Sequence, residues 1–103
     1  MGSPGGSRII TAILQSIVND LDLEMHPYAS VARGRIHHQF FPEKVYLPDS
    51  KSGEKLREPL ERLGHAIGDS RWQAKVFLVR RDERGLIGVA DPRGDGQPMG
   101  APP

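Results

Sequence analysis

An apolar helical pattern near the N-terminal end constrains this chain more than any other feature. Its members recur every three or four residues, as one face of an α-helix requires: Ile9, Ile10, Ile13, Leu14, Ile17, Val18 and Leu21. Ser7 is a suitable N-cap for this helix. Pro27 limits its extension, so the helix is predicted to end at about Leu23 or Glu24. The apolar arc is broad and needs cover on more than one side, and we therefore expect the chain to be part of a larger layered structure.

The middle of the chain carries shorter patterns. They predict a short helix over 28–32, strands over 35–40 and 44–47, and a loop over 48–53. A Leu-rich helix follows. Because a proline strains a helix interior, we expect this helix to start near Arg57, with Pro59 in its first turn, and to end before Gly64 at the C′ position.

The last regular element is a predicted β-hairpin, with strands over 74–80 and 86–90 and a turn over 82–85. An isolated two-stranded hairpin is marginal in water, so it too needs a partner. The order helix, strands, helix, hairpin places the chain in the α+β class. We expect one incomplete domain over 1–96, followed by a flexible Gly- and Pro-rich tail over 97–103.

Composition excludes several classes of protein. The chain has 103 residues, and 14 basic against 13 acidic side chains give a formal net charge of +1. That balance gives no electrostatic reason to expect a nucleic acid or an anionic membrane as a partner. The absence of cysteine excludes disulfides and thiolate metal sites. No apolar run approaches the roughly 18 residues of a membrane span, and residues 1–6 do not resemble a signal peptide.

Two glycines directly before the apolar helix are the candidate functional motif. Gly5 and Gly6 expose backbone N–H groups with no Cβ in the way, beside the free donors and the positive dipole end of a helix N-terminus. Such a place binds anions, and in acyl transfer it would be an oxyanion hole. The alternative is a flexible leader before a capped helix. Arg8 in the first turn opposes the helix dipole, so something should compensate its charge.

Other polar residues fit structural roles better. His37 and His38 are adjacent in a predicted strand and point to opposite faces, so we expect no metal site, one buried histidine and one half-exposed histidine. Thr11 is discounted as a nucleophile because no base is expected beside it. Asp91-Pro92-Arg93 predicts a fixed turn with an ion pair or backbone capping. Trp72 and Phe77 are expected to pack rather than to bind a ligand.

Three segments, taken in order, resemble the small C-terminal subunit of γ-glutamyltransferases. They are Gly2-Ser3-Pro4-Gly5-Gly6-Ser7-Arg8-Ile9, then Arg35-Ile36-His37-His38-Gln39-Phe40-Phe41-Pro42, similar to the family's R-F-H-H-Q-W-x-P, and then Gly88-Val89-Ala90-Asp91-Pro92-Arg93, similar to its G-A-x-D-P-R. Each motif is weak alone, but the ordered set is highly specific and covers about residues 2–96.

The resemblance implies an N-terminal-nucleophile hydrolase, a four-layer αββα sandwich. In that family a precursor cleaves itself, and the new N-terminal threonine attacks the γ-glutamyl amide of glutathione or a related compound. The acyl group then passes to water, an amino acid or a peptide. By resemblance Gly5 and Gly6 match the glycines whose N–H groups hold the oxyanion, and no cofactor is implied.

The resemblance also implies that much of the active site lies elsewhere. The nucleophile, the residues that grip the substrate's α-amino end and the large-subunit arginine lie upstream in the family, outside these 103 residues. We therefore expect the isolated chain to be inactive, and the remainder of the enzyme to be its partner. A truncated gene, an internal start or a split enzyme would each account for a chain that begins inside a motif. The family implies a periplasmic or extracellular location.

A second hypothesis belongs to another class of protein. The chain could be a non-catalytic remnant that acts as a small binding or assembly module. An upstream sequence with the nucleophile region favours the first hypothesis, and an isolated gene favours the second.

Overall fold

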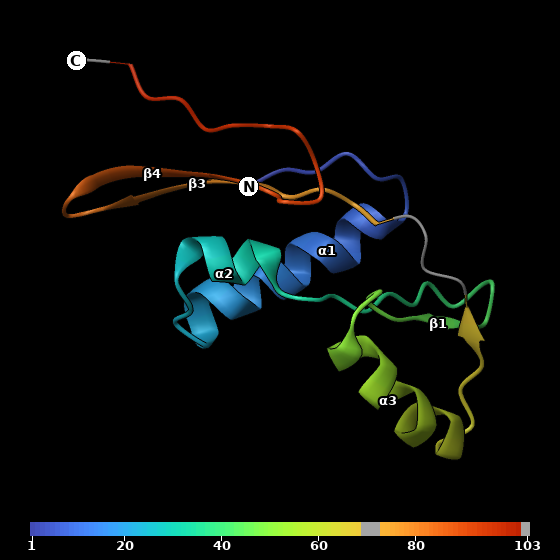
Figure 1. Ribbon diagram of the computed structural model, residues 1–103. Coiled ribbons are helices and arrows are strands. Elements are labelled where there is room, and N and C mark those ends of the chain that lie inside the picture. Colours follow the sequence, from blue (N-terminus) through green and yellow to red (C-terminus); the bar gives the residue numbers. More distant parts are fainter. Residues whose placement is uncertain (69–72, 102–103) are drawn as a thin grey trace.

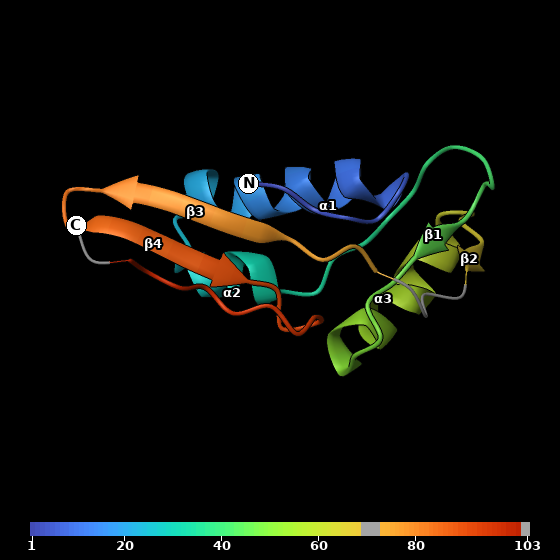
Figure 2. The same cartoon turned by 90° about the horizontal axis from the view of Figure 1, so that it is seen from above.

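The computed structural model describes residues 1–68 and 73–101, which form an elongated α+β structure with principal extents of 53 × 25 × 22 Å. Two regions are distinct in Figure 1. The hairpin region contains the first two helices and the C-terminal hairpin. The outer region contains α3 and two very short strands, and it lies at the other end of the molecule, as Figure 2 shows. Trp72 lies outside the described residues, so the expectation for its side chain is not addressed.

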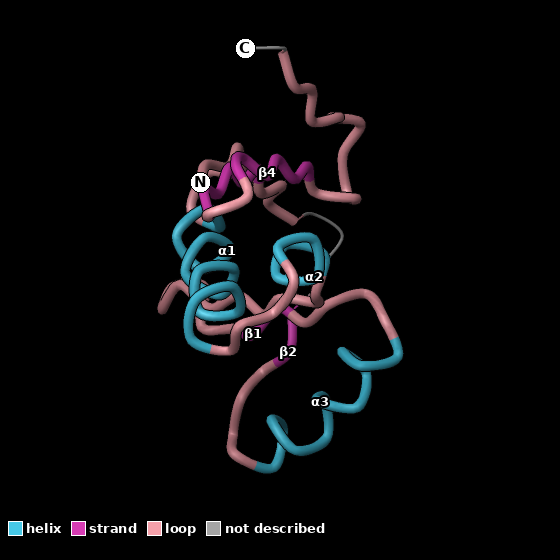
Figure 3. Tube along the Cα trace, turned by 90° about the vertical axis from the view of Figure 1, so that its left-hand side faces the viewer, coloured by secondary structure: helices cyan, strands magenta, loops and turns pink. Residues whose placement is uncertain are grey.

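The hairpin region has two helices on one face of a two-stranded sheet. Its elements are α1 (Arg8–Ile17), α2 (Pro27–Ala32), β3 (Phe77–Asp82) and β4 (Gly85–Ala90). Figure 3 shows α1 and α2 side by side beneath the hairpin. The core between them consists of Ala12, Val31, Ala74, Val76, Leu78 and Val89, with Ile87 packed against it.

The predicted hairpin is confirmed. β3 pairs antiparallel with β4 from Phe77↔Ala90 to Asp82↔Gly85, which leaves a loop of two residues at 83–84. The first strand begins three residues later than predicted, because the Lys75 N–H donates to Pro4 O and the Val76 N–H donates to the Asp91 carboxylate, not to the backbone of β4. Phe77, which is 40% exposed, lies close to Gly96, the last residue of the predicted domain. The division into a domain over 1–96 and a flexible tail over 97–103 stays a prediction.

The first helix is continuous to Asp22, but its last turn is not α-helical. Residues Val18–Asp22 form a π-helix, η1, in which the Leu23 N–H donates to Val18 O at 3.0 Å. This wider turn accommodates two buried polar side chains. Asn19 Nδ2 donates to Ser30 O at 3.2 Å, and Asp20 pairs with Arg80 at 2.7 Å. The prediction of a helix ending near Leu23 holds, whereas the expectation of a single α-helical geometry was wrong.

One side of α1 faces the core, and the other side is apolar and exposed. Ile10 and Leu14 in α1 are 74% and 58% exposed, and Leu21, which continues this side in η1, is 65% exposed. This is the broad apolar arc that the sequence predicted to need a second partner. No helix among residues 1–68 and 73–101 has the length and apolar character of a membrane span.

The short second helix agrees with the sequence and begins one residue early, at Pro27. The His26 side chain accepts a hydrogen bond from the Tyr28 N–H and so caps the first turn. The helix ends at Ala32, before Gly34.

The predicted strand over 35–40 was wrong. The segment is extended only in part, and a single bridge joins His37 to Tyr46. Phe40 takes a positive φ of 72°, which ends the extended conformation. The neighbouring prediction holds in shortened form as β1 (Val45–Tyr46), which pairs in parallel with β2 (Ile67–Gly68), a strand that the sequence analysis missed.

The third helix, α3, spans Lys51–Arg62, so the predicted start near Arg57 and the predicted loop over 48–53 were wrong. Ser50 caps the helix by accepting a hydrogen bond from the Gly53 N–H at 3.2 Å. The stabilisation from this cap outweighs the loss of one backbone hydrogen bond at Pro59, which has no N–H to donate inside the helix. Gly64 ends the helix at C′ as predicted, with φ of 92°. The N–H groups of Gly64 and His65 donate to Glu61 O and Leu60 O, the pattern of a Schellman motif.

Candidate functional site

The glycine loop, residues 4–7, leads directly into α1. Its two glycines have positive φ values, 151° for Gly5 and 55° for Gly6, conformations that L side chains rarely adopt. Gly5 O and Gly6 O accept hydrogen bonds from the N–H groups of Arg8 and Ile9 at 3.1 and 3.2 Å. The N–H groups of Gly5 and Gly6 themselves have no acceptor among the residues that the structure describes. The loop therefore presents free donors at a helix N-terminus.

Close packing fixes Gly5 in its place. A Cβ on this buried residue would lie 2.6 Å from the Cβ of Ala74 and 3.0 Å from its Cα, so no larger residue fits. At Gly6, which is exposed, a Cβ would meet no atom within 4 Å. Gly5 is thus required by contact and backbone angle, and Gly6 by backbone angle alone.

Residues 74–77 support the N-terminal segment from behind. The Lys75 N–H donates to Pro4 O at 3.4 Å, and Gly2 and Phe77 exchange two backbone hydrogen bonds of 2.9 and 2.7 Å. The segment before the glycine loop therefore lies alongside the start of β3.

A buried ionic network fixes the position of residues 74–76. The Asp91 carboxylate, which is 1% exposed, accepts hydrogen bonds from Arg35 Nη2 and from the Val76 N–H, both at 2.8 Å. It also accepts from the N–H and Nη1 of Arg93 at 3.0 and 2.9 Å. Arg35 in turn donates to Ala74 O. The prediction of a fixed 91–93 turn is confirmed, and it has both an ion pair and backbone capping.

The network sets the ionisation of its members. Burial alone would raise the pKa of Asp91, but hydrogen bonds from Val76, Arg93 and Arg35 outweigh burial, so its pKa lies below the usual range. Burial lowers the pKa of Arg35, against the hydrogen bond to Asp91.

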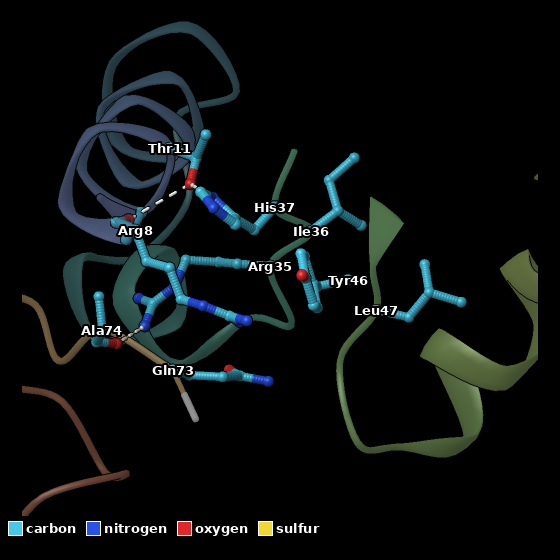
Figure 4. A pocket seen from close by; sticks show the side chains of 10 residues that line it. Arg8, Thr11, Arg35, Ile36, His37, Tyr46, Leu47, Gln73 and Ala74 are labelled. Carbon is cyan, nitrogen blue, oxygen red and sulfur yellow. Dashed lines mark hydrogen bonds between the residues drawn. The ribbon is translucent and has the colours of Figure 1, made fainter. Parts of the chain in front are cut away.

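A pocket of about 20 Å³ lies beside the first turn of α1, and it has room for about one water molecule. Arg8, Thr11, Arg35, His37 and Tyr46 are among the residues that line it (Figure 4). The Arg8 guanidinium lies 4.3 Å from the centre of the Tyr46 ring, a cation–π contact that compensates the charge in the first turn of α1.

The expectation that Thr11 has no base beside it was wrong. His37 Nδ1 lies 2.6 Å from Thr11 Oγ1, and Figure 4 shows the ring next to the hydroxyl. His37 Nε2 lies 2.8 Å from Gln39 Oε1. Ser7 is not a side-chain cap either, since its hydroxyl donates to Gln39 Oε1 at 2.7 Å. The sequence analysis missed the role of Gln39, although the spacing of two residues among Arg35, His37 and Gln39 could have indicated a shared face.

The two histidines differ as expected in burial. His37 is 6% exposed, whereas His38 is exposed and accepts a hydrogen bond from the Phe40 N–H. Within the described parts of the chain, no three histidine, aspartate or glutamate side chains are grouped so that they could hold a metal ion. Separately, the free N–H groups of Gly5 and Gly6 lie at the N-terminus of α1, where the helix dipole favours anions.

Comparisons with known proteins point to one family. A family model described as Gamma-glutamyltranspeptidase matches residues 1–101. The chain is 34% identical over 99 residues to a Glutathione hydrolase proenzyme of Pseudomonas aeruginosa, covering 93% of this chain and 18% of the relative. It is 35% identical over 94 residues to the Glutathione hydrolase proenzyme of Escherichia coli, covering 89% of this chain and 16% of the relative. The chain thus spans less than a fifth of these curated relatives.

Solved structures agree with the sequence relatives. A gamma-glutamyltranspeptidase from Pseudomonas nitroreducens complexed with L-DON superposes with a TM-score of 0.87 at 32% identity, covering 98% of this chain and 54% of that chain. The transpeptidase enzyme CapD of Bacillus anthracis has a TM-score of 0.80 at 19% identity, which shows the fold alone. The likeness confirms the α+β class and the αββα sandwich of N-terminal-nucleophile hydrolases to which the sequence assigned the chain.

Proposed function

This chain belongs to the gamma-glutamyltranspeptidase family, and we propose that it is the C-terminal part of a γ-glutamyltransferase that supplies the oxyanion hole. The complete enzyme cleaves γ-glutamyl amides such as glutathione and transfers the γ-glutamyl group to water, an amino acid or a peptide. In this proposal the N–H groups of Gly5 and Gly6 donate to the oxygen that becomes negative when the nucleophile attacks the γ-carbonyl.

The observation that carries the proposal is the pair of unsatisfied donors in a fixed loop. Neither the Gly5 nor the Gly6 N–H has an acceptor in the described part of the chain, while Ala74 and the first turn of α1 fix the loop. Donors that are oriented in advance stabilise developing charge without reorganising during the reaction, and each contributes about 2.7–4 kcal/mol. The helix dipole adds to the same effect.

The remaining machinery belongs to other parts of the enzyme. The nucleophilic threonine, the groups that hold the α-amino and α-carboxylate ends of the substrate, and the layers that cover the exposed side of α1 would come from the large subunit and the N-terminal part of the small subunit. An acivicin-inhibited gamma-glutamyltranspeptidase at 33% identity has a C-terminus with critical roles in autoprocessing and catalysis, which supports a functional C-terminal segment here.

A host enzyme allows the test: a full-length γ-glutamyltransferase in which residues 1–101 of this chain replace the corresponding segment. Gly6→Val would force a β-branched residue into φ of 55° and displace the donors. We expect kcat of the processed enzyme to fall by a factor of roughly 10² to 10³. The assay is chromophore release from a γ-glutamyl anilide, with self-cleavage checked first. The isolated chain is expected to give no turnover above buffer.

Gly85→Val is the matched control. Gly85 also has a positive φ, 126°, and an added Cβ would meet no atom within 4 Å, but it lies at the hairpin turn. The control should keep kcat once processed. A processed Gly6→Val enzyme with unchanged kcat would mean that the glycines only begin the helix, and the proposal would fail.

A further inference from the structure

The segment 35–39 places three alternate side chains around the glycine loop. Arg35 donates to Ala74 O, whose residue packs against Gly5. His37 contacts Thr11 on α1, and Gln39 contacts Ser7, the residue directly after Gly6. The segment is not a strand, yet its alternation still turns these side chains to one side. The intervening Ile36 and His38 are exposed.

A continuous chain of hydrogen bonds joins Gln39, His37, Ser7 and Thr11. The Ser7 hydroxyl donates to Gln39 Oε1 at 2.7 Å, and the same oxygen lies 2.8 Å from His37 Nε2. Since an amide oxygen can only accept, Nε2 must carry the proton. In neutral His37, Nδ1 then accepts from the Thr11 hydroxyl at 2.6 Å. The Gln39 amide nitrogen is also held, because it donates to Phe41 O at 2.9 Å, which fixes the direction of Oε1.

We propose that His37 and Gln39 are positioning residues that hold Ser7 and the first turn of α1, and thereby aim the Gly5 and Gly6 N–H groups at the oxyanion. This inference rests on the proposed function of the glycines. The loop is fixed by Ala74 only at Gly5, whereas Gly6 has no neighbour where its Cβ would be. Besides the hydrogen bond from the Ile9 N–H to Gly6 O, the Ser7–Gln39 hydrogen bond ties the residue directly after Gly6 to the 35–39 segment.

The Thr11–His37 pair has the contacts of a nucleophile and a base, but its surroundings favour the positioning role. The pocket beside it, of about 20 Å³, has room for roughly one water molecule. The Thr11 hydroxyl also lies within α1, where Arg8 O at 3.2 Å is a second acceptor that shares the single hydroxyl proton with His37 Nδ1.

The test compares single variants in the host enzyme, with rates normalised to the processed enzyme. Ser7→Ala removes one hydrogen bond and should lower kcat about 2- to 12-fold. His37→Ala removes the centre of the chain and should cost up to roughly 100-fold, the effect of a misplacement of about 1 Å. KM for the γ-glutamyl donor should change little, because the donors act mainly in the transition state.

Two further variants separate positioning from folding. Ser7→Thr keeps the hydroxyl, so its kcat should be close to that of the wild type, unlike that of Ser7→Ala. Its midpoint of thermal unfolding should be no closer to the wild-type value than the midpoint of Ser7→Ala. His38→Ala removes an exposed histidine next in sequence and should leave kcat and KM unchanged.

Each result decides between the two levels of the proposal. Loss of kcat in Ser7→Ala and His37→Ala, with rescue by Ser7→Thr, supports the positioning role. If Gly6→Val lowers kcat but Ser7→Ala and processed His37→Ala do not, the positioning role is wrong and the oxyanion hole stands. If Gly6→Val has no effect, the proposed function itself has failed.

Discussion

The hairpin region and the outer region are held together by different forces. The hairpin region encloses charges: Asp91 is 1% exposed and Arg35 is 6% exposed, and they meet within the apolar core. In the outer region the ion pairs of α3, Glu54 with Arg57 and Glu58 with Arg62, lie on the surface. Helix α3 is defined by its two ends, the Ser50 cap and the Gly64 motif, and Leu63 beside its end is 76% exposed.

The comparison shows where precise positioning is needed. Burying an ion pair contributes little net stability, because desolvation offsets the attraction, but losing one partner is costly. The hairpin region nevertheless buries the Arg35–Asp91 pair, and the Arg35 side chain also fixes Ala74 against Gly5. The outer region carries none of the proposed donors and relies on local hydrogen bonds of its backbone.

The largest expected effect comes from Asp91→Ala. It leaves Arg35 charged and unpaired in the core, which should cost about 3–5 kcal/mol of unfolding free energy. Thermal and urea unfolding of the host enzyme would measure the loss. Glu54→Ala in the outer region, which removes an exposed pair, should cost less than about 1 kcal/mol. Equal effects of the two variants would erase the proposed difference between the regions.

A smaller effect should follow from acid. The folded-state pKa of Asp91 lies below its ordinary value, so the ionised carboxylate contributes stability that is fully present above the unfolded pKa of about 3.9. That contribution is lost as pH falls through the lower, folded pKa. Hydrogen exchange should therefore show that the hairpin region loses protection below pH ~4. Asp91→Asn should weaken this dependence, and an unchanged acid profile in that variant would contradict the assignment.

An effect of about 1 kcal/mol is expected for Ser50→Ala, because it removes the acceptor for the Gly53 N–H at the start of α3. The loss should be local, so amide exchange should speed up in the first turn of α3 and not in the hairpin. Faster exchange in β3 and β4 would show that the two regions unfold as one unit.

The smallest effect is expected for Glu58→Ala. Glu58 pairs with Arg62, which lies one helical turn later, and both side chains are exposed. The change in unfolding free energy should therefore be about 0.3–0.5 kcal/mol, and it should shrink at high salt. A loss above about 1 kcal/mol would mean that the outer region has a stronger electrostatic contribution than its exposure indicates.

The sequence by itself determined the local features of this protein. Apolar periodicity located the first helix, the turn residues located the hairpin, and Gly64 marked the end of α3. The ordered motifs identified the family, including the two glycines before the helix. These predictions succeeded because each depends on residues within a few positions of one another, where backbone sterics and hydrogen bonding act directly.

Only the tertiary structure decided what the polar side chains of 35–39 contact. Arg35 meets Asp91 across 56 positions, Ser7 meets Gln39 across 32, and Thr11 meets His37 across 26. Local patterning predicted a strand for 35–40. The guanidinium of Arg35 and the imidazole of His37 are both buried, and buried polar groups need hydrogen-bond partners, which here lie on other elements and not in a neighbouring strand. Such partners are fixed by how the chain packs as a whole, and no periodicity within one segment specifies them.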